Sequence, residues 1–156
     1  CIGQGYTLVT PLQIARMVSA ICTGVLVKPR LLEQEAVVHS PLPVSPETLS
    51  FLRSGMKGAV QIGSAQRLKC ISGFEVGAKT GTAQTCSLDT EQVYKHQLEH
   101  AWFCGFFTYE GGNPLVLVVL LENAGHSRYA VEMADRFLRG YRALQGGSGA
   151  LVSPNA

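Results

Sequence analysis

The chain has 156 residues, of which 46% are hydrophobic and 15% are charged, and its formal net charge is +2. This length and composition allow one hydrophobic core, so we expect one compact unit. Basic and acidic residues are mixed along the chain without a run of Lys or Arg, which argues against a surface that binds nucleic acid. The longest apolar run, Leu115 to Leu121, is shorter than the roughly 20 residues of a membrane-spanning helix and predicts a buried strand.

Two helix-start signals stand in the first half of the chain. The segment Thr10 to Gln13 is a capping box with Pro at the first helical position, and it predicts a helix that ends near Gly24. Ser45 to Glu47 repeats the start signal before a second helix with an apolar stripe that runs to Val60. Between them, three prolines predict that residues 25 to 44 form a mostly extended connection.

The second half predicts three strands and a last helix. The strands are expected at roughly Phe74 to Thr85, Ala101 to Thr108 and Leu115 to Glu122. The short turn from Glu110 to Pro114 favours antiparallel pairing, and strands that are apolar on both faces indicate a sheet covered by helices on each side. The last helix begins near Ser127 and aligns Ala130, Ala134, Phe137 and Tyr141. The predicted class is α+β, with a three-stranded antiparallel sheet.

The motif that indicates chemistry is Lys79-Thr80-Gly81-Thr82, in the first expected strand. Lys79 offers a positive charge, and Thr80 and Thr82 offer hydroxyl donors for a substrate carboxylate. Gly81 lacks a side chain, so an extended peptide can approach the strand as it would a sheet edge. The backbone N–H of Thr82 is a candidate donor of an oxyanion hole. A Lys-Thr-Gly tripeptide accompanies Ser-x-x-Lys and Ser-Asp-Asn in β-lactamases and penicillin-binding proteins.

The order of several segments resembles the C-terminal part of the transpeptidase domain of class B penicillin-binding proteins. The resemblance covers residues 2 to 143, and the elongation-type group of that class, penicillin-binding protein 2, is the most similar. The segments that carry the resemblance are Ile2 to Tyr6, Thr10 to Ala15, Lys79 to Gln84, His100 to Phe106, and Leu121 to Asn123 before a final helix.

The resemblance implies a partial serine transpeptidase fold of the β-lactamase-like type, with the Lys79 strand at the edge of a five-stranded antiparallel sheet. It also implies that a serine attacks the D-Ala-D-Ala bond of a peptidoglycan stem peptide, forms an acyl-enzyme and passes the acyl group to an amine of a neighbouring strand. By that analogy Lys79, Thr80 and Thr82 hold the carboxylate of the substrate or of a β-lactam, and the Thr82 N–H helps to bind the oxyanion.

The resemblance further implies a division of the chain and a place in the cell. Residues 1 to 143 are expected to form the C-terminal portion of the transpeptidase domain, and residues 144 to 156 a flexible tail. Because the sequence opens on Cys1 without Met or a signal segment, we expect residues upstream of it. The full protein would be anchored by an upstream segment at the outer face of the cytoplasmic membrane, in the periplasm, and would work with a polytopic glycosyltransferase of the elongation machinery. No cofactor is expected.

The nucleophile is not expected within this chain. Ser54 and Lys57 match the Ser-x-x-Lys spacing, but they fall inside the second predicted helix, whereas the family's serine opens a helix far upstream of the Lys-Thr-Gly strand. Ser153 and Asn155 match a bare Ser-x-Asn in the tail, in the wrong order for the family. Ser64 stands where many relatives carry threonine, and we expect it to lie away from the proposed chemistry. The fragment should therefore be inactive alone.

Several alternatives remain open. The chain could belong to a β-lactamase or β-lactam sensor that shares the same box, or to a non-catalytic binding module. A metal site of Cys86, His96, His100 and Cys104, or a disulfide between Cys86 and Cys104, is a minority hypothesis. The five cysteines are odd in number and lack Cys-x-x-Cys pairs, which argues against a disulfide framework or a zinc ribbon, so no metal is expected.

Overall fold

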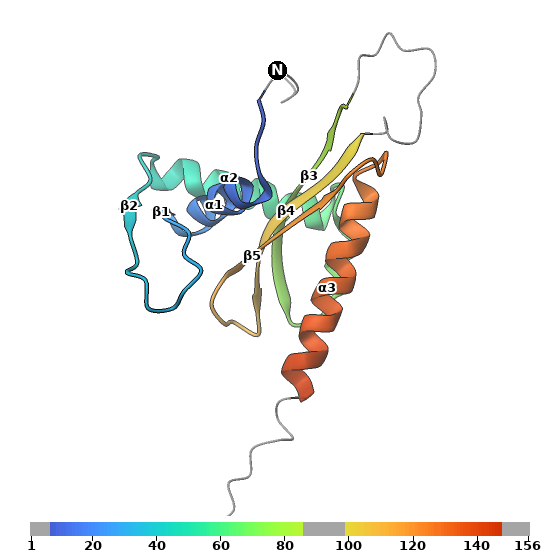
Figure 1. Cartoon of the computed structure of the whole chain (residues 1–156). Helices are drawn as coiled ribbons and strands as arrows, with labels where there is room; N and C mark the ends of the chain where they lie inside the picture. The colour runs from blue at the N-terminus through green and yellow to red at the C-terminus, as the bar shows by residue number, and fades with distance from the viewer. Residues whose placement is uncertain (1–6, 86–98, 148–156) are drawn as a thin grey trace, which may run out of the picture.

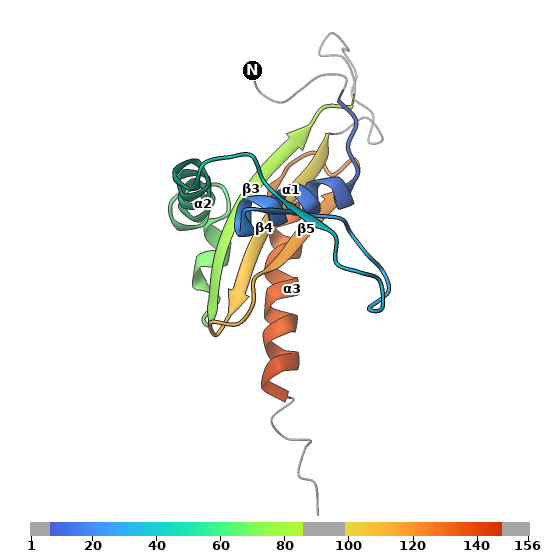
Figure 2. The same cartoon turned by 90° about the vertical axis from the view of Figure 1, so that its left-hand side faces the viewer.

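The computed structural model describes residues 7–85 and 99–147, in which a three-stranded antiparallel sheet lies between helices (Figures 1 and 2). α3 covers one face of the sheet, α1 crosses the other face, and α2 lies alongside β3 (Figure 2). The α+β class with a helix-covered antiparallel sheet, predicted from the sequence, is confirmed. The elements in chain order are α1 (Pro11–Thr23), β1 (Val25–Val27), β2 (His39–Pro41), α2 (Pro46–Gln61), the 3-10 helix η1 (Gln66–Cys70), β3 (Phe74–Ala83), β4 (His100–Tyr109), β5 (Leu115–Leu121) and α3 (Arg128–Gly147).

The helix starts follow from the capping chemistry of the sequence. At α1, the Gln13 N–H donates to Thr10 Oγ1 over 3.3 Å, and the Thr10 N–H donates to Gln13 Oε1 over 2.7 Å. At α2, the Thr48 N–H donates to Ser45 Oγ over 3.3 Å. Each bond gives a partner to an N–H group that has none within its own helix. Both predicted helix starts are therefore confirmed.

The sheet has the strand order β3-β4-β5, and both pairings are antiparallel. The β3–β4 ladder runs from Phe74 opposite Tyr109 to Ala83 opposite His100. The turn between β4 and β5 contains Glu110 with φ 49° and Gly111 with φ 74°, a backbone shape that a tight reversal requires. Within the described residues, β3 and β5 are therefore the two outer strands of this sheet.

The main core lies between the sheet and α3. Residues paired across the ladder point to the same face, so Val76 and Phe107, Ala78 and Gly105, and Thr80 and Phe103 all face α3. η1 and the residues around it close the same core beside β3. The buried members of this core are Val60, Ala65, Leu68, Ile71, Val76, Ala78, Ala101, Phe103, Phe107, Ala130, Val131, Ala134 and Leu138.

A buried carboxylate links η1 to α3 at the edge of this core. Asp135 is 4% exposed, and its two oxygens each accept from Arg139 Nε over 3.1 Å. Arg67 of η1 approaches the same carboxylate, with its Nε 3.4 Å from Asp135 Oδ2. A buried carboxylate is tolerated only when it is paired, and these two guanidinium groups supply the pairing. The segment that leads into β3 is thereby tied to the helix behind the sheet.

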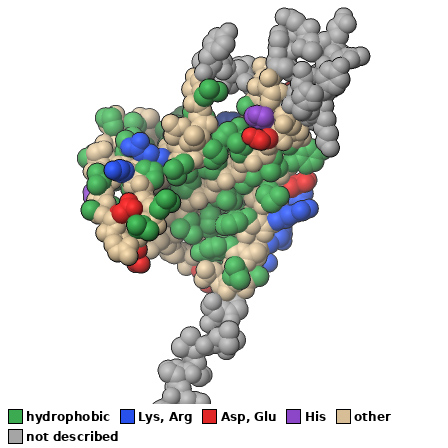
Figure 3. Space-filling model, in the orientation of Figure 1, with side chains coloured by type: hydrophobic (Ala, Val, Ile, Leu, Met, Phe, Trp, Pro, Cys, Tyr) green, Lys and Arg blue, Asp and Glu red, His purple; other side chains and the backbone are tan. Residues whose placement is uncertain are grey.

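Several large hydrophobic side chains of β5 and α3 are exposed. Figure 3 shows hydrophobic side chains gathered over the sheet and the adjoining side of α3. The exposed residues include Leu115 of β5 and Met133, Phe137 and Leu144 of α3. No helix within residues 7–85 and 99–147 has the length and the apolar character that crossing a membrane requires.

Four details differ from the sequence-based expectation. The connection over residues 25 to 44 contains β1 and β2, which pair as a small antiparallel sheet, and η1 had no predicted counterpart. Phe137 was expected to face the core but is 47% exposed, because the buried stripe of α3 passes through Leu138 instead. α3 also continues to Gly147, past the boundary expected at residue 143. Leu144 and Gln145 are good helix formers, which explains the extension.

Candidate functional site

The Lys79 to Thr82 segment occupies the C-terminal half of β3. Its backbone pairs with β4 on one side, where Lys79 is opposite Cys104 and Thr82 is opposite Ala101. On the other side, α2 lies alongside β3, and the C-terminal end of the strand extends beyond that helix (Figure 2). Within residues 7–85 and 99–147 no strand pairs with this second edge of β3. The segment therefore lies on an edge strand, as the resemblance implies.

The functional side chains of the segment lie on opposite faces of the sheet. Lys79 is exposed and shares its face with Cys104, whereas Thr80 is 8% exposed and shares the α3 face with Phe103. Thr82 lies on the same face as Thr80 and is exposed. Because successive side chains of a strand alternate in direction, Lys79 lies on one face of the sheet and the two threonines lie on the other. A ligand that contacts all three must lie along the free edge of the strand.

Thr80 is the point where the polar contacts of the segment meet. The Lys79 ammonium donates to the backbone carbonyl oxygen of Thr80. The Thr80 hydroxyl lies 2.7 Å from the hydroxyl of Ser64, in the short loop after α2. The expectation that Ser64 lies away from the proposed chemistry is therefore wrong. No pattern in the sequence identified this residue, because the contact depends on how the loop between α2 and η1 folds onto β3.

Gly81 is not required by the packing of the described residues. A Cβ atom placed on it would lie 3.6 Å from Cβ of Trp102, which is an ordinary van der Waals contact. The neighbouring Gly105 is different, since a Cβ there would lie 2.5 Å from the carbonyl oxygen of Gly77. The fold needs glycine at position 105 but tolerates a side chain at position 81. The absence of a side chain at Gly81 is therefore consistent with a close approach from outside the sheet.

Cys104 lies beside Lys79 but is not an activated nucleophile. Its thiol donates to the Lys79 carbonyl oxygen over 3.6 Å. Burial raises the pKa of the Cys104 thiol, and the nearby Lys79 charge and the contact with the Lys79 carbonyl oppose this rise without reversing it. A reactive cysteine needs a lowered pKa, because the thiolate is the nucleophile. Cys104 therefore lacks the lowered pKa of an activated thiol.

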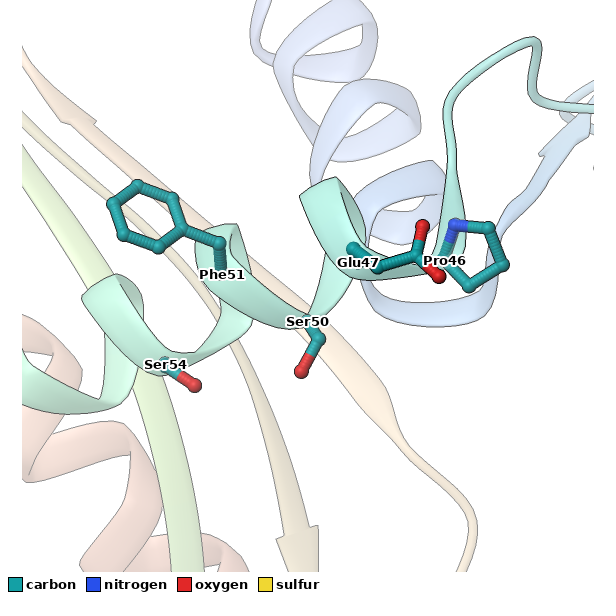
Figure 4. A pocket seen from close by; sticks show the side chains of 5 residues that line it. All are labelled: Pro46, Glu47, Ser50, Phe51 and Ser54. Atoms are coloured by element: carbon teal, nitrogen blue, oxygen red, sulfur yellow. The ribbon is translucent and has the colours of Figure 1, made fainter.

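Ser54 and Lys57, which match the Ser-x-x-Lys spacing, both lie on α2. Ser54 is exposed on α2 beside a shallow hollow of about 550 Å³, also lined by Pro46, Glu47, Ser50 and Phe51. Figure 4 shows Ser50 and Ser54 pointing to the same side of the helix, with Phe51 directed away. The Lys57 ammonium forms an ion pair with Glu75 at the start of β3.

The remaining sequence-based candidates lie partly or wholly outside the described residues. Of the hypothetical metal ligands, Cys86 and His96 are outside them, and His100 Nδ1 accepts a hydrogen bond from the Asn123 N–H over 3.0 Å. No group of three or more potential metal-binding His, Cys, Asp or Glu side chains occurs within residues 7–85 and 99–147. The Ser153 to Asn155 motif also falls outside the described residues, as does the Cys86 partner of the possible link to Cys104.

Comparison with known sequences gives one consistent family. The sequence model of the penicillin binding protein transpeptidase domain matches residues 1–139. Peptidoglycan D,D-transpeptidase MrdA of Haemophilus influenzae is 32% identical over 145 residues, which cover 80% of this chain and 22% of the relative. The probable peptidoglycan D,D-transpeptidase PenA of Neisseria gonorrhoeae is 29% identical over 147 residues, covering 94% of this chain and 24% of the relative. The chain thus spans about a quarter or less of these relatives.

Comparison with solved structures gives the same fold. Penicillin-binding protein 2 of Helicobacter pylori, solved in a complex with MreC, superposes with a TM-score of 0.73 at 25% identity, over 92% of this chain and 26% of that one. The D,D-transpeptidase domain of a peptidoglycan glycosyltransferase from Eggerthella lenta superposes with a TM-score of 0.65 at 23% identity, over 88% of this chain and 33% of that one. The second likeness concerns the fold alone.

Proposed function

The chain belongs to the penicillin-binding protein transpeptidase family, and from this premise we propose that it forms the Lys-Thr-Gly wall of a peptidoglycan D,D-transpeptidase. The observation that carries the proposal is the position of Lys79 to Thr82 at the C-terminal end of an edge strand whose second edge has no strand partner among the described residues. An extended stem peptide adds to such an edge by backbone hydrogen bonds, with its carboxylate beside the segment.

The four residues have separate roles in this proposal. Lys79 supplies positive charge at the strand edge, and the Thr80 and Thr82 hydroxyls donate to the terminal carboxylate of the substrate or of a β-lactam. Gly81 leaves room for the peptide backbone to approach. The Thr82 N–H donates to the oxyanion that forms when the carbonyl is attacked. These roles follow from the family likeness, and they are supported by the position of the segment on a strand whose second edge has no strand partner among the described residues.

The covalent chemistry of the whole protein needs a serine that we propose to lie outside this chain. Its hydroxyl oxygen attacks the carbonyl of the penultimate D-Ala, its proton passes to a base, and the terminal D-Ala leaves with a proton on its amine. The acyl-enzyme then reacts with an amine of a neighbouring stem peptide, which restores the serine hydroxyl and forms the cross-link. A β-lactam acylates the same serine. The names of the relatives favour this transpeptidase role over a β-lactamase, a sensor or a binding module.

We extend the proposal to the surroundings of the whole protein. By likeness to the relatives, it is anchored at the outer face of the cytoplasmic membrane by an upstream segment, and its catalytic domain works in the periplasm. A polytopic glycosyltransferase of the elongation machinery is the proposed partner, and the likeness to a penicillin-binding protein 2 solved with MreC suggests a second kind of partner. Residues 1–143 are proposed to belong to the transpeptidase domain, and residues 144–156, which begin within the last turn of α3, to a tail.

The five-stranded sheet implied by the resemblance also remains a proposal. Among the described residues, β5 has no strand partner on its outer edge, and hydrophobic side chains gather beside it (Figure 3). Other segments of the whole domain are expected to pair there and cover this apolar surface, because an uncovered strand edge promotes aggregation.

Labelling with a fluorescent penicillin tests the proposed function. The full-length protein is expected to form a covalent adduct that survives denaturation, whereas the 156-residue chain alone is expected to remain unlabelled, because the serine lies elsewhere. Ser54→Ala in the full-length protein is expected to leave labelling unchanged. Labelling of the short chain that disappears in Ser54→Ala would reverse the assignment of roles, and an unlabelled, folded full-length protein would contradict the proposed function.

A further inference from the structure

We propose that Ser64 is a positioning residue of the carboxylate-binding site, which acts by orienting the Thr80 hydroxyl. This inference rests on the proposed function, because it assumes that Thr80 donates to the carboxylate of a substrate or β-lactam. Its basis is the 2.7 Å contact between Ser64 Oγ and Thr80 Oγ1, which joins residues 16 positions apart in the chain. A distance of this length is typical of a well-formed hydroxyl–hydroxyl hydrogen bond.

The difference in burial between Thr80 and Ser64 indicates that Ser64 acts on Thr80. Thr80 is 8% exposed and pairs with the buried Phe103, so its side chain is held against the core. Ser64 is exposed, and it covers the Thr80 hydroxyl from the loop after α2. A hydroxyl that is largely buried needs a hydrogen-bond partner, and the Ser64 hydroxyl supplies one for Thr80.

The number of hydroxyl protons determines what the Ser64–Thr80 hydrogen bond leaves available for a ligand. Each hydroxyl has one proton and two lone pairs, and one proton is used in the bond between Ser64 and Thr80. If Ser64 donates, the Thr80 oxygen acts as acceptor and its own proton remains available for a carboxylate. A bound carboxylate accepts only, so it selects this arrangement. Ser64 then fixes the Thr80 rotamer and directs its single proton toward the ligand.

The loop that carries Ser64 is held by its two neighbours. A Cβ atom on Gly63 would lie 2.8 Å from Cα and 2.9 Å from the carbonyl oxygen of Ala59, so any side chain there would displace the backbone. Ala65 is fully buried, and its N–H donates to the Ala59 carbonyl oxygen over 3.0 Å. Ser64 is therefore presented to Thr80 from a backbone that packs tightly on the end of α2. Such support is what a precise positioning residue needs.

The test compares acylation of the full-length protein by a penicillin and by the methyl ester of the same penicillin. Ser64→Ala is expected to lower acylation by the free carboxylate about two- to tenfold, which is the range of one neutral hydrogen bond, and to leave acylation by the ester unchanged. Ser64→Thr is expected to restore the rate with the carboxylate, because it keeps the hydroxyl. Ser50→Ala, which removes an exposed serine from α2, serves as the matched control.

A double-mutant cycle separates this inference from the proposed function. If Ser64 acts through Thr80, Ser64→Ala is expected to cause no further loss in a Thr80→Val background. No effect of Thr80→Val on acylation would contradict the proposed role of Thr80 itself. A clear effect of Thr80→Val together with unchanged acylation in Ser64→Ala would overturn only the role of Ser64.

Acylation by the methyl ester distinguishes a positioning role of Ser64 from a purely structural one. Equal losses with the carboxylate and the ester in Ser64→Ala would overturn the inference, because a general disturbance of β3 affects both reactions alike. Gly63→Ala provides a second perturbation, since it displaces the loop but retains the serine hydroxyl. We expect Gly63→Ala to slow acylation by the free carboxylate while leaving acylation by the methyl ester unchanged. An unchanged rate with the carboxylate would contradict the inference.

Discussion

Replacing Lys79 with Ala in the full-length protein is expected to lower the second-order rate constant of acylation by penicillin roughly ten- to 150-fold. This range corresponds to a hydrogen bond with a charged group, on the order of 1.5 to 3 kcal/mol. The structure supports the expectation because Lys79 is exposed on β3 and its ammonium donates to the Thr80 carbonyl oxygen. Stopped-flow or quenched-label kinetics with melting temperature as a folding check measures the effect.

Two further variants sharpen this prediction. Lys79→Arg is expected to recover only part of the lost rate, since a planar guanidinium does not replace a compact ammonium on a strand where Cys104 lies opposite. Lys69→Ala removes an exposed lysine of η1 and is the matched control, with a change expected within about 0.5 kcal/mol. Unchanged acylation in Lys79→Ala would mean that this lysine is only a solvated surface residue.

Replacing Phe103 with Ala is expected to lower the free energy of unfolding by about 3 to 5 kcal/mol. Phe103 is 1% exposed and lies between Thr80 of β3 and Val119 of β5, facing the core beneath α3. Removing its ring leaves a cavity directly behind the Lys79 to Thr82 segment. We therefore expect slower acylation as well as lower stability, because the edge strand loses its support.

The control for this variant is Phe51→Ala. Phe51 has the same side chain but is 79% exposed on α2, so its removal is expected to change stability by no more than about 0.5 kcal/mol. Denaturant unfolding of the full-length protein, followed by fluorescence, compares the two variants. If Phe103→Ala were no more destabilising than Phe51→Ala, the proposed support of β3 by the buried ring would be wrong.

The helices and strands were predictable because their causes are local. The starts of α1 and α2 follow from Thr10 with Gln13 and from Ser45 with Pro46, residues that act within one turn of helix. β4 and β5 follow from two apolar runs separated by a glycine-rich turn. β1 and β2 were missed because strands of three residues are too short to show a hydrophobic pattern.

The candidate site was predictable in part. The Lys-Thr-Gly tripeptide was recognisable from sequence, and its position at a strand edge followed from the resemblance. The contact between Ser64 and Thr80 was not predictable, because it joins a loop to a strand through the tight packing of Gly63 on Ala59. The burial of Thr80 likewise depends on tertiary packing, which alternation along a strand does not determine.

The most direct measurement is a crystal structure of the full-length protein acylated by a penicillin. The account predicts that the acyl group is on a serine outside the 156-residue chain and that the penicillin lies along the free edge of β3. One carboxylate oxygen should lie within roughly 3.2 Å of a hydroxyl of Thr80 or Thr82. An acyl-enzyme whose carboxylate contacts none of Lys79, Thr80 and Thr82 would contradict the account.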